Sequence, residues 1–512
     1  MVKLVNPLFS LILALALALS NVPFQGVLAS LSPDQHHHAA AEGTNVLQSF
    51  LTYNTTLESS IRPLNELSES QFTSFSHPLF PRYSVRVKKS KFCDATVNSY
   101  TGYVDFQGRH MFFYFFESRR DPDADDVILW TNGGPGCSSS LGLFMELGPC
   151  RILDEHGPKF HPESWNSNAN VFFIDQPVGA GFSYFDFEHT IATSEEAARD
   201  IAAFIVIFFE NFPEFKGRAF HMAGESYGGH VLPNFASHVY DQNARLLQEE
   251  VTPINLVSVM MGDGLTDVLT MTTSYYDMQC TPTSIAPIND VQTCVRLKQL
   301  RRRCQKWIPQ ACVEHFDAME CSTVINQCGF PFAEALNAVN KNPWDISKDC
   351  YDDPTGDSCY PEIKHHIEYL NRPNVRQAIG VDPTFTANFS LCNEDVLDAF
   401  HASLDSLHST QDYVAALLER GVRVLVYVGT YDWLCNWIGN ERWTKEMKWS
   451  GQKDFVDQEL RDWFVDGRRS GITRSARGLT FATVEGAGHM VPYDKPKEAL
   501  ELMKRWLRDD KL

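Results

Sequence analysis

Short, continuous apolar runs that alternate with helical patterns constrain the fold of this chain more than any other feature of its sequence. A strand with one solvent-exposed face alternates apolar and polar residues, so continuous apolar runs indicate strands buried on both faces. An amphipathic helix is predicted at about 194–212, with Thr193 and Glu196 as a capping box at its start. The chain is therefore expected to be α/β, with a central, mostly parallel sheet covered by helices on both faces. The predicted strands are 127–130, 171–174, 219–223, 256–261, 422–428 and 479–484.

The pentapeptide Gly224-Glu225-Ser226-Tyr227-Gly228 directly follows one of these runs. In that position G-x-S-x-G is typical of a nucleophile elbow, a tight turn from strand to helix that lifts the serine hydroxyl clear of the sheet. Glycines are needed on both sides because a Cβ there would clash, and the amides at the helix start can face a developing oxyanion. The pattern predicts Ser226 as a nucleophile, although the same pentapeptide also occurs in ordinary turns.

A serine hydroxyl is a weak nucleophile and needs a base, and in hydrolases with such an elbow the chain order is serine, acid, histidine. Asp432 follows the run 422–428 and His489 follows the run 479–484, in that order. Taken singly, an acidic residue after a strand is often a turn former, and a histidine in a glycine-rich loop is often structural. Because the carboxyl ends of parallel strands meet at one edge of the sheet, all three side chains are expected to assemble there.

A glycine-rich segment from Trp130 to Ser139 also follows a predicted strand. A phosphate-binding loop is one interpretation, but no lysine follows the glycines and the Walker pattern is missing. An oxyanion-hole loop fits better, with the Gly134 N–H acting beside the Tyr227 N–H. A plain tight turn is the remaining alternative.

The composition indicates a large folded domain from an oxidising compartment. The 512 residues are 44% apolar and carry a net charge of -20, so a sizeable core is expected and a nucleic-acid partner is not. The 13 cysteines include no CxxC pair, which favours disulfides over a zinc site. They crowd between about 270 and 365, where the strand pattern breaks, and this interval is interpreted as a mainly helical lid inserted into one domain.

The N-terminal part of the chain carries targeting and processing signals. Residues 1–29 have a positive start, an apolar stretch too short for a membrane span and a small-residue end, which predict a signal peptide. Residues 30–89 are polar, lack sustained strand patterning and end in Lys88-Lys89, so a propeptide with a dibasic processing site is expected. An ordered N-terminal extension is the alternative. Residues 90–512 are expected to form the catalytic domain, and Asn54 and Asn388 lie in glycosylation sequons.

Four motifs together resemble the serine carboxypeptidases, a family with the α/β-hydrolase fold, and within it the carboxypeptidase Y-like branch. The motifs are Trp130 to Ser139, Asp175 to Tyr184, Gly224 to His230 and Gly488 to Pro492. Matching motifs begin near Tyr100 and continue to the C-terminus. The resemblance implies the triad Ser226, Asp432 and His489, which the pattern of strands also indicates, and the oxyanion donors Gly134 and Tyr227.

The resemblance also implies how the free C-terminus of a substrate is bound. Asn132, Gly133, Glu146 and Glu225 match the carboxylate-binding network of the family. Two ionised glutamates would repel a carboxylate, whereas protonated ones donate hydrogen bonds, so activity is expected to peak in mild acid. The pocket for substrate side chains is expected to be apolar and to be lined by Trp130, Leu141, Met145, Leu434, Cys435 and Met490.

The family pattern implies five disulfides and leaves Cys435 as a free thiol beside Asp432. Cys93 and Cys150 fall outside that pattern, and their pairing with each other is a hypothesis that accounts for all 13 cysteines. Asp263 stands where the family usually has asparagine, a departure expected to alter a turn and not the chemistry. The implied pairs are Cys137–Cys392, Cys280–Cys294, Cys304–Cys328, Cys312–Cys321 and Cys350–Cys359.

These observations predict a serine carboxypeptidase that hydrolyses the C-terminal bond of peptides and proteins through an acyl-enzyme on Ser226. No metal or organic cofactor is implied, no stable membrane insertion is expected and no oligomeric state is predicted. The expected destination is the secretory pathway, in a vacuole- or lysosome-like compartment or outside the cell. An esterase or acyltransferase with the same triad is an alternative, as is a non-catalytic homologue that binds a partner enzyme.

Overall fold

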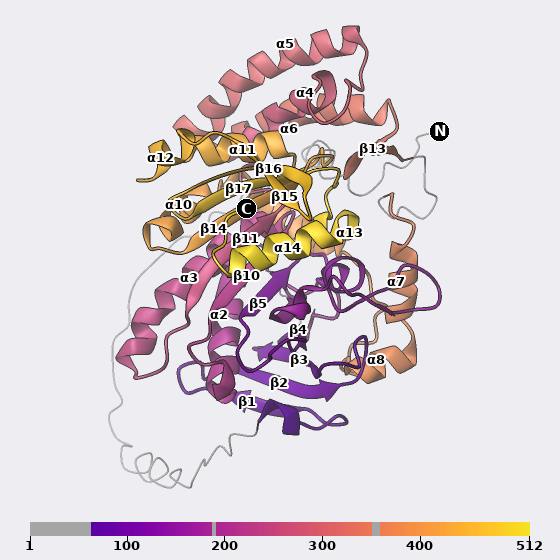
Figure 1. The fold of residues 1–512 in the computed structure, drawn as a ribbon, viewed down its shortest axis with the longest axis vertical. Helices are drawn as coiled ribbons and strands as arrows, with labels where there is room; N and C mark the ends of the chain where they lie inside the picture. The colour runs from indigo at the N-terminus through magenta and orange to yellow at the C-terminus, as the bar shows by residue number, and fades with distance from the viewer. Residues whose placement is uncertain (1–62, 187–190, 351–358) are drawn as a thin grey trace, which may run out of the picture.

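The computed structural model describes residues 63–186, 191–350 and 359–512, and a 13-stranded sheet runs through it (Figure 1). In spatial order its strands are β1 (Thr73–Ser76), β2 (Tyr83–Ser90), β3 (Ser99–Phe106), β4 (Arg109–Phe116), β8 (Asn170–Ile174), β5 (Val127–Thr131), β10 (Phe220–Glu225), β11 (Leu256–Gly262), β14 (Arg423–Gly429), β17 (Leu479–Val484), β16 (Arg468–Ala476) and β15 (Arg461–Val465), with β9 (Tyr184–Phe185) paired to β4. From β8 to β17 every pair of neighbours is parallel. The predicted α/β fold and its six buried strands are confirmed.

The outer strands are antiparallel, and two of them correct an expectation. Residues 30–89 were expected to lack strands, but β1 and β2 belong to the main sheet and β2 pairs along its whole length with β3. Val85 and Val87 are buried and alternate with Arg86, which is the period of two expected of a strand. The pattern is short and lies among polar residues. Lys89 lies inside β2, so the proposed processing site is part of a hydrogen-bonded strand. Residues 1–62, which include the predicted signal peptide and Asn54, lie outside the described part of the chain.

Helices cover both faces of the sheet (Figure 1). Alternate residues of β5 enter two different cores: Val127 and Leu129 face α2 (Ser194–Asn211), α3 (Gly228–Gln248) and α10 (Gln411–Glu419), whereas Ile128 and Trp130 face α14 (Pro496–Leu507). This division follows from the period of two along a strand. Apart from the lid, the remaining α-helices of the described residues are α7 (Ile363–Leu370), α8 (Pro373–Ile379), α9 (Glu394–Ala402), α11 (Trp437–Glu446), α12 (Gln452–Val456) and α13 (Val491–Asp494).

The start of α2 shows why the helix begins where the sequence predicts. The Thr193 hydroxyl accepts a hydrogen bond from the Glu196 N–H at 3.3 Å. The Glu196 carboxylate accepts from the Ala192 N–H at 3.2 Å, and not from the Thr193 N–H as a complete capping box requires. The N-cap prediction is therefore confirmed, and its reciprocal bond is displaced by one residue.

The lid expected at about 270–365 is helical and lies at one end of the molecule (Figure 1). It consists of α4 (Val268–Cys280), α5 (Val291–Ile308) and α6 (Ala318–Asn337), followed by a hairpin of β12 (Lys341–Asn342) and β13 (Asp345–Asp349). The structure joins the five cysteine pairs that the resemblance implies and also joins Cys93 to Cys150. Four of the six bonds lie within the lid region or at its end, where they close short loops. Outside the lid, the short strands β6 (Cys150–Arg151) and β7 (Lys159–Phe160) form a separate pair.

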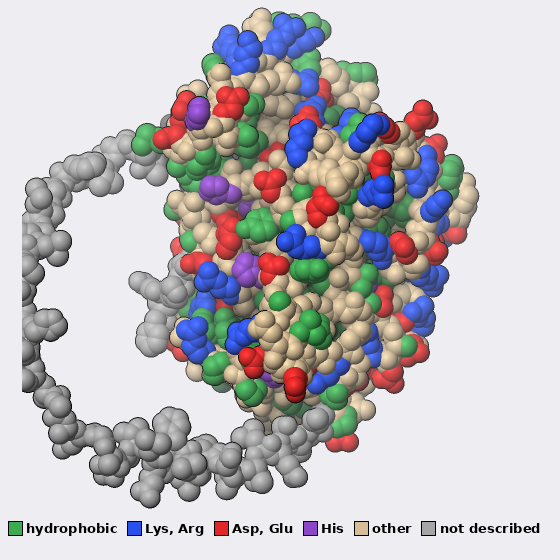
Figure 2. Space-filling view, turned by 90° about the vertical axis from the view of Figure 1, so that its left-hand side faces the viewer, with side chains coloured by type: hydrophobic (Ala, Val, Ile, Leu, Met, Phe, Trp, Pro, Cys, Tyr) green, Lys and Arg blue, Asp and Glu red, His purple; other side chains and the backbone are tan. Residues whose placement is uncertain are grey.

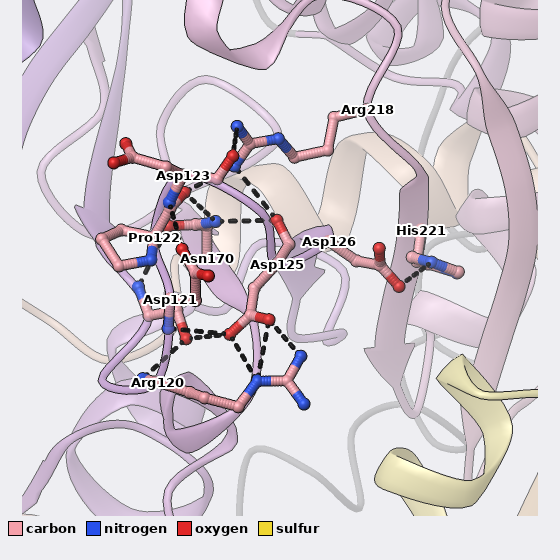
Figure 3. Close-up of polar contacts among 10 residues, drawn as sticks. Arg120, Asp121, Pro122, Asp123, Asp125, Asp126, Asn170, Arg218 and His221 are labelled. Atoms are coloured by element: carbon pink, nitrogen blue, oxygen red, sulfur yellow. Dashed lines mark hydrogen bonds and ion pairs between the residues drawn. The ribbon is translucent and has the colours of Figure 1, made fainter.

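Polar contacts hold the loop that leads into β5, at the edge of the sheet where the parallel strands begin (Figure 3). The Asp125 carboxylate pairs with Arg120, and the Asp125 carbonyl accepts hydrogen bonds from Asn170 at 3.0 Å and from Arg218 at 3.2 Å. Because parallel strands run in one direction, this edge lies opposite the carboxyl ends of β5 and β10. The contacts of Asp125 therefore do not involve the loops at the carboxyl ends of the strands, where a site can form.

The surface charge is unevenly distributed despite the net charge of -20. Helix α5 carries Arg296, Lys298, Arg301, Arg302, Arg303 and Lys306 and no acidic residue. Lys and Arg side chains gather at the end of the molecule formed by the lid (Figure 2). Among the described residues, no helix is both long and apolar enough to span a lipid bilayer.

Candidate active site

Ser226 occupies the sharp turn between β10 and α3. Its φ of 62° lies in the left-handed region, a strained conformation for a residue with a Cβ. The turn is held by hydrogen bonds from the Ser226 N–H to the Gly262 carbonyl at 3.1 Å and from the Gly229 N–H to the Ser226 carbonyl at 2.9 Å. A Cβ on Gly224 would stand 2.4 Å from the Thr131 carbonyl oxygen, so this position requires glycine. The predicted elbow is present.

His489 and Asp432 meet beside this elbow from the loops that follow β17 and β14. His489 Nδ1 and Asp432 Oδ2 are 2.8 Å apart, and both side chains are buried. The Cys435 N–H donates to both oxygens of the Asp432 carboxylate at 3.2 Å. The His489 N–H donates to the Trp344 carbonyl at 2.7 Å, which ties the histidine loop to the lid hairpin. The imidazole is therefore fixed on its Nδ1 side and presents Nε2 to its surroundings.

The glycine-rich loop after β5 packs directly onto the elbow. A Cβ on Gly133 would lie 2.3 Å from the Tyr227 nitrogen, so only a glycine lets the loop approach that amide. The loop is anchored at its far side by Asp175, which accepts from the Ser138 hydroxyl at 2.6 Å and from the Ser139 N–H at 3.0 Å. Burial raises the pKa of Asp175 to about 6. Backbone amides are thus concentrated where the loop and the elbow meet, as an oxyanion hole requires.

Asn132 connects two buried glutamates at the end of β5. Its amide nitrogen lies 3.2 Å from Glu146 Oε1 and 3.3 Å from Glu225 Oε1. Its amide oxygen accepts from the Trp130 indole at 2.7 Å and from the Gly142 N–H at 2.9 Å, which fixes the side-chain orientation. Trp130 and the turn at Gly142–Glu146 therefore aim the Asn132 amide group at the glutamate pair.

Burial favours the neutral forms of the two glutamates. Desolvation raises the pKa of Glu146, and desolvation together with the adjacent Glu146 raises the pKa of Glu225 well above its ordinary value. The Glu146 Oε2 atom has no hydrogen-bond partner among the described residues. A protonated pair beside Ser226 is suited to donate hydrogen bonds to an anionic group of a ligand.

The likeness of most of the chain to known proteins agrees with this geometry. A sequence model of the serine carboxypeptidase family matches residues 90–509. The chain belongs to the serine carboxypeptidase family. It is 37% identical to carboxypeptidase Y of Komagataella phaffii, over 84% of this chain and 80% of that one. It is 35% identical to a vacuolar serine-type carboxypeptidase of Saccharomyces cerevisiae, over 85% of each chain.

A solved structure also supports the assignment of this chain to the serine carboxypeptidase family. A prohormone-processing carboxypeptidase from Saccharomyces cerevisiae matches with a TM-score of 0.68 and 25% sequence identity. The match covers 83% of this chain and 92% of the other. The family membership, the hydrolase class and the α/β-hydrolase fold predicted from the sequence are therefore confirmed.

The elbow, the glycine-rich loop and the lid of the carboxypeptidase enclose a cavity of about 200 Å³. Tyr275 and Ile325 from the lid, together with Leu404, form much of its apolar wall. The predicted site residues that line this cavity are Asn132, Gly133, Gly134, Leu141, Glu225, Ser226, Tyr227, Leu434, Cys435, His489 and Met490.

Two residues predicted to line the pocket do not. Trp130 and Met145 are fully buried and do not line the cavity. Trp130 points to the core face of β5, where its indole orients Asn132, and Met145 packs with the lid residues Trp344 and Tyr360. Sequence position indicates nearness to a site, but the direction of the side chain depends on which face of the strand or turn it occupies.

Sequence reasoning missed Asp405, which anchors the residue after the nucleophile. Its carboxylate accepts from the Tyr227 hydroxyl at 2.6 Å and from the Ser194 hydroxyl at 2.6 Å, and its Oδ2 lies 3.4 Å from His230 Nε2. Although burial opposes it, these hydrogen bonds hold the pKa of Asp405 at about 2. No local pattern marks Asp405, because its partners come from two other elements of the chain.

Cys435 is a buried free thiol beside the triad, as expected. Desolvation, followed by the charge of Asp432, raises its pKa well above the ordinary value, which disfavours the thiolate. One ligand atom from each of Cys435, Asp432 and His489 lies within 4.8 Å of the others, because Asp432 is hydrogen-bonded to both His489 Nδ1 and the Cys435 N–H.

Proposed function

We propose that this serine carboxypeptidase releases the C-terminal residue of peptides and proteins by two acyl transfers through Ser226. The Ser226 hydroxyl attacks the last peptide carbonyl while His489 Nε2 accepts its proton. The amides of Gly134 and Tyr227 stabilise the oxyanion, and Asp432 orients the imidazole and stabilises its charged form.

The second half of the reaction uses the same groups. His489 returns the proton to the nitrogen of the leaving amino acid, the C–N bond breaks and the acyl group stays on Ser226. Water then attacks this ester while His489 accepts a proton from the water. The bond between the acyl carbon and Ser226 Oγ breaks, His489 returns the proton to Ser226 Oγ, and the shortened peptide leaves as a carboxylic acid. Every proton passes through the imidazole, and none of these reaction steps requires a redox change or a metal.

The observation that carries the assignment is the Asn132, Glu146 and Glu225 network beside Ser226. A substrate with a free C-terminus places a carboxylate one residue beyond the scissile bond, and Glu225 is the residue directly before Ser226. Protonated glutamates and the Asn132 amide would donate to that carboxylate, and Gly133 would let the substrate approach the backbone. An esterase needs no such group for its substrate.

The decisive experiment compares an N-blocked dipeptide with its C-terminal amide at about pH 5, a value between the pKa of an ordinary carboxyl and that of histidine. Release of the amino acid from the free acid, much slower release from the amide and loss of both in Ser226→Ala are expected. The loss should exceed about 10⁴-fold, because the nucleophile is removed. Hydrolysis of small esters without release from the free acid would point to an esterase or acyltransferase. If wild type and Ser226→Ala both fail to act on any of these substrates, the non-catalytic binding homologue would be favoured.

We also propose that the chain works in the secretory pathway, in a vacuole-like compartment or outside the cell. The disulfides fit an oxidising compartment. In this scheme residues 1–29 act as the signal peptide, residues 90–512 form the catalytic domain, and residues 30–89 are a propeptide whose release at Lys89 requires β2 to leave the sheet. Asn388 is an exposed residue in a sequon, which supports its assignment as a glycan site.

A further inference from the structure

Asp263 lies beside the acid of the triad, which the sequence did not indicate. It follows β11, and its φ of 43° is in the left-handed region that asparagine and aspartate tolerate. Its N–H donates to the Tyr427 carbonyl at 2.8 Å, and its Oδ1 accepts from the Gly429 N–H at 2.9 Å. The expectation that an aspartate at this position only alters a turn remains a prediction, and the position of the side chain argues against it. The turn accepts either residue, and the side chain reaches the triad.

The second oxygen of Asp263, Oδ2, is buried and receives no hydrogen bond from any donor among the described residues. The two aspartates meet at one glycine: Asp263 Oδ1 accepts from the Gly429 N–H at 2.9 Å, and the Gly429 carbonyl accepts from the Asp432 N–H at 3.4 Å. The Asp432 carboxyl therefore lies close to that of Asp263, within side-chain hydrogen-bonding range. Two carboxyl groups share a hydrogen bond only when one of them carries a proton. The Asp432 oxygens already accept from the Cys435 N–H and contact His489, so Asp432 is engaged as an acceptor. The proton therefore belongs on Asp263.

The surroundings of Asp263 reinforce this assignment. Desolvation, followed by the charge of Asp432, raises the pKa of Asp263 well above its ordinary value, and Glu146 adds to the repulsion. The charge of Asp263 in turn raises the pKa values of Glu225, Tyr427 and Cys435, and none of these three groups is a cation. The basic group of the triad, His489, is bonded through Nδ1 to Asp432.

We propose that Asp263 is a positioning residue that acts through Asp432. Its protonated carboxyl donates from Oδ2 to the Asp432 carboxylate and holds that carboxylate in the orientation from which it accepts the His489 Nδ1–H. The proposal rests on the proposed catalytic roles of Asp432 and His489. An asparagine, the residue usual in the family, would donate from its amide nitrogen at every pH. The aspartate donates only while it is protonated, so this chain makes the alignment of its triad conditional on acid.

The pH dependence follows because only the protonated form of Asp263 can donate to Asp432. Below its pKa, Asp263 is neutral and supports Asp432. As the pH rises through that pKa, Asp263 loses its proton, two carboxylates face each other in a buried site, and Asp432 is pushed from its position. The loss falls on kcat, because the alignment of the base changes and no contact with the substrate does.

The test compares wild type with Asp263→Asn and Asp263→Ala on an N-blocked amino-acid ester, which lacks the carboxylate that Glu146 and Glu225 would bind. In Asp263→Asn, the alkaline limb of kcat is expected to move up by about one pH unit or more, since the amide donor does not titrate. In Asp263→Ala, kcat is expected to fall roughly 10-fold or more at acidic pH, because Asp432 loses its donor. Asp267→Asn is the matched control: a buried aspartate of the same loop that caps α4 at the Thr270 N–H, a task asparagine also performs. Its pH profile should keep the wild-type position.

A second measurement keeps the proposal separate from the proposed function. The rate of Ser226 modification by a fluorophosphonate reports the nucleophilicity of the triad without any peptide substrate. If wild type reacts at Ser226 but releases no amino acid, the proposed function fails, and the shift between wild type and Asp263→Asn can still be read from this rate. Superimposable pH profiles for wild type and Asp263→Asn, or equal losses at acidic pH in the asparagine and alanine variants, would overturn the role of Asp263.

Discussion

Glu225 illustrates how a single buried side chain can be both next to the nucleophile and part of substrate binding. It is the last residue of β10, directly before Ser226, and its carboxyl turns toward Glu146 and Asn132. Among the described residues no cation forms an ion pair with either glutamate, and Arg151 donates to the Glu146 carbonyl instead of to its carboxyl. Burial favours the neutral form of both glutamates, and the neighbouring Glu146 adds to this effect for Glu225, so the hydrogen-bonding capacity of the pair depends on pH.

Replacing Glu225 by glutamine should remove much of this pH dependence from substrate binding. In wild type the raised pKa keeps the donor form at acidic pH, and as the pH rises the pair ionises and repels the substrate carboxylate. The KM for a free-acid peptide is thus expected to rise about 10-fold or more between mild acid and neutral pH, and Glu225→Gln should flatten this rise. Steady-state kinetics across the pH range measure it, with a peptide ester as the control substrate. A wild-type KM that does not change with pH would contradict the assignment.

At the scale of elements, β2 decides how much of the N-terminal segment belongs to the folded enzyme. Leu64, Val85 and Val87 are buried in the main core, and Lys88 is buried beside Phe72. Each apolar side chain of this size stabilises the fold by roughly 1.5–3 kcal/mol when fully buried. A protease could cut at Lys89 only if β2 first left the sheet.

A chain that starts at Ser90 is expected to lose about 5 kcal/mol or more of unfolding free energy, or not to fold, because β1 and β2 are removed. A chain that starts at Pro63 keeps both strands and serves as the matched control. Urea titrations of the two proteins measure the difference. If the shorter chain proved as stable as the control, the strands would contribute nothing, and mature residues could begin at Ser90 without cost.

For the whole molecule, buried carboxyls with raised pKa values gather around the site. Folding raises the pKa of Asp175 from its ordinary 3.8 to about 6, and raises those of Glu146, Glu225 and Asp263 as well. A carboxyl whose pKa rises on folding takes up protons as the chain folds. Its contribution is fully present below the unfolded pKa and is lost as the pH rises through the folded pKa. Asp405, with its pKa lowered to about 2, works in the opposite direction and loses its contribution only in stronger acid.

The protein is therefore expected to be most stable in mild acid and to lose stability toward neutral pH. Asp175 alone accounts for up to about 3 kcal/mol of this change, at about 1.4 kcal/mol for each unit of its pKa shift. The free energy of unfolding measured at a series of pH values tests the trend, and Asp175→Asn should reduce its slope between about pH 4 and pH 6. A stability maximum at neutral or alkaline pH would show that other groups dominate.

The sequence by itself determined the six parallel strands, the elbow at Ser226 and the order of the triad. Each depends on local information: continuous apolar runs show burial on both faces, glycines show where a Cβ cannot fit, and residues just past parallel strands must share one edge. The contacts of Asp263 with the triad, the anchoring of Tyr227 by Asp405 and the inward direction of Trp130 were decided only by the tertiary structure. They join residues far apart in the chain, and a linear pattern specifies which face of an element is buried but not which distant side chain packs against it.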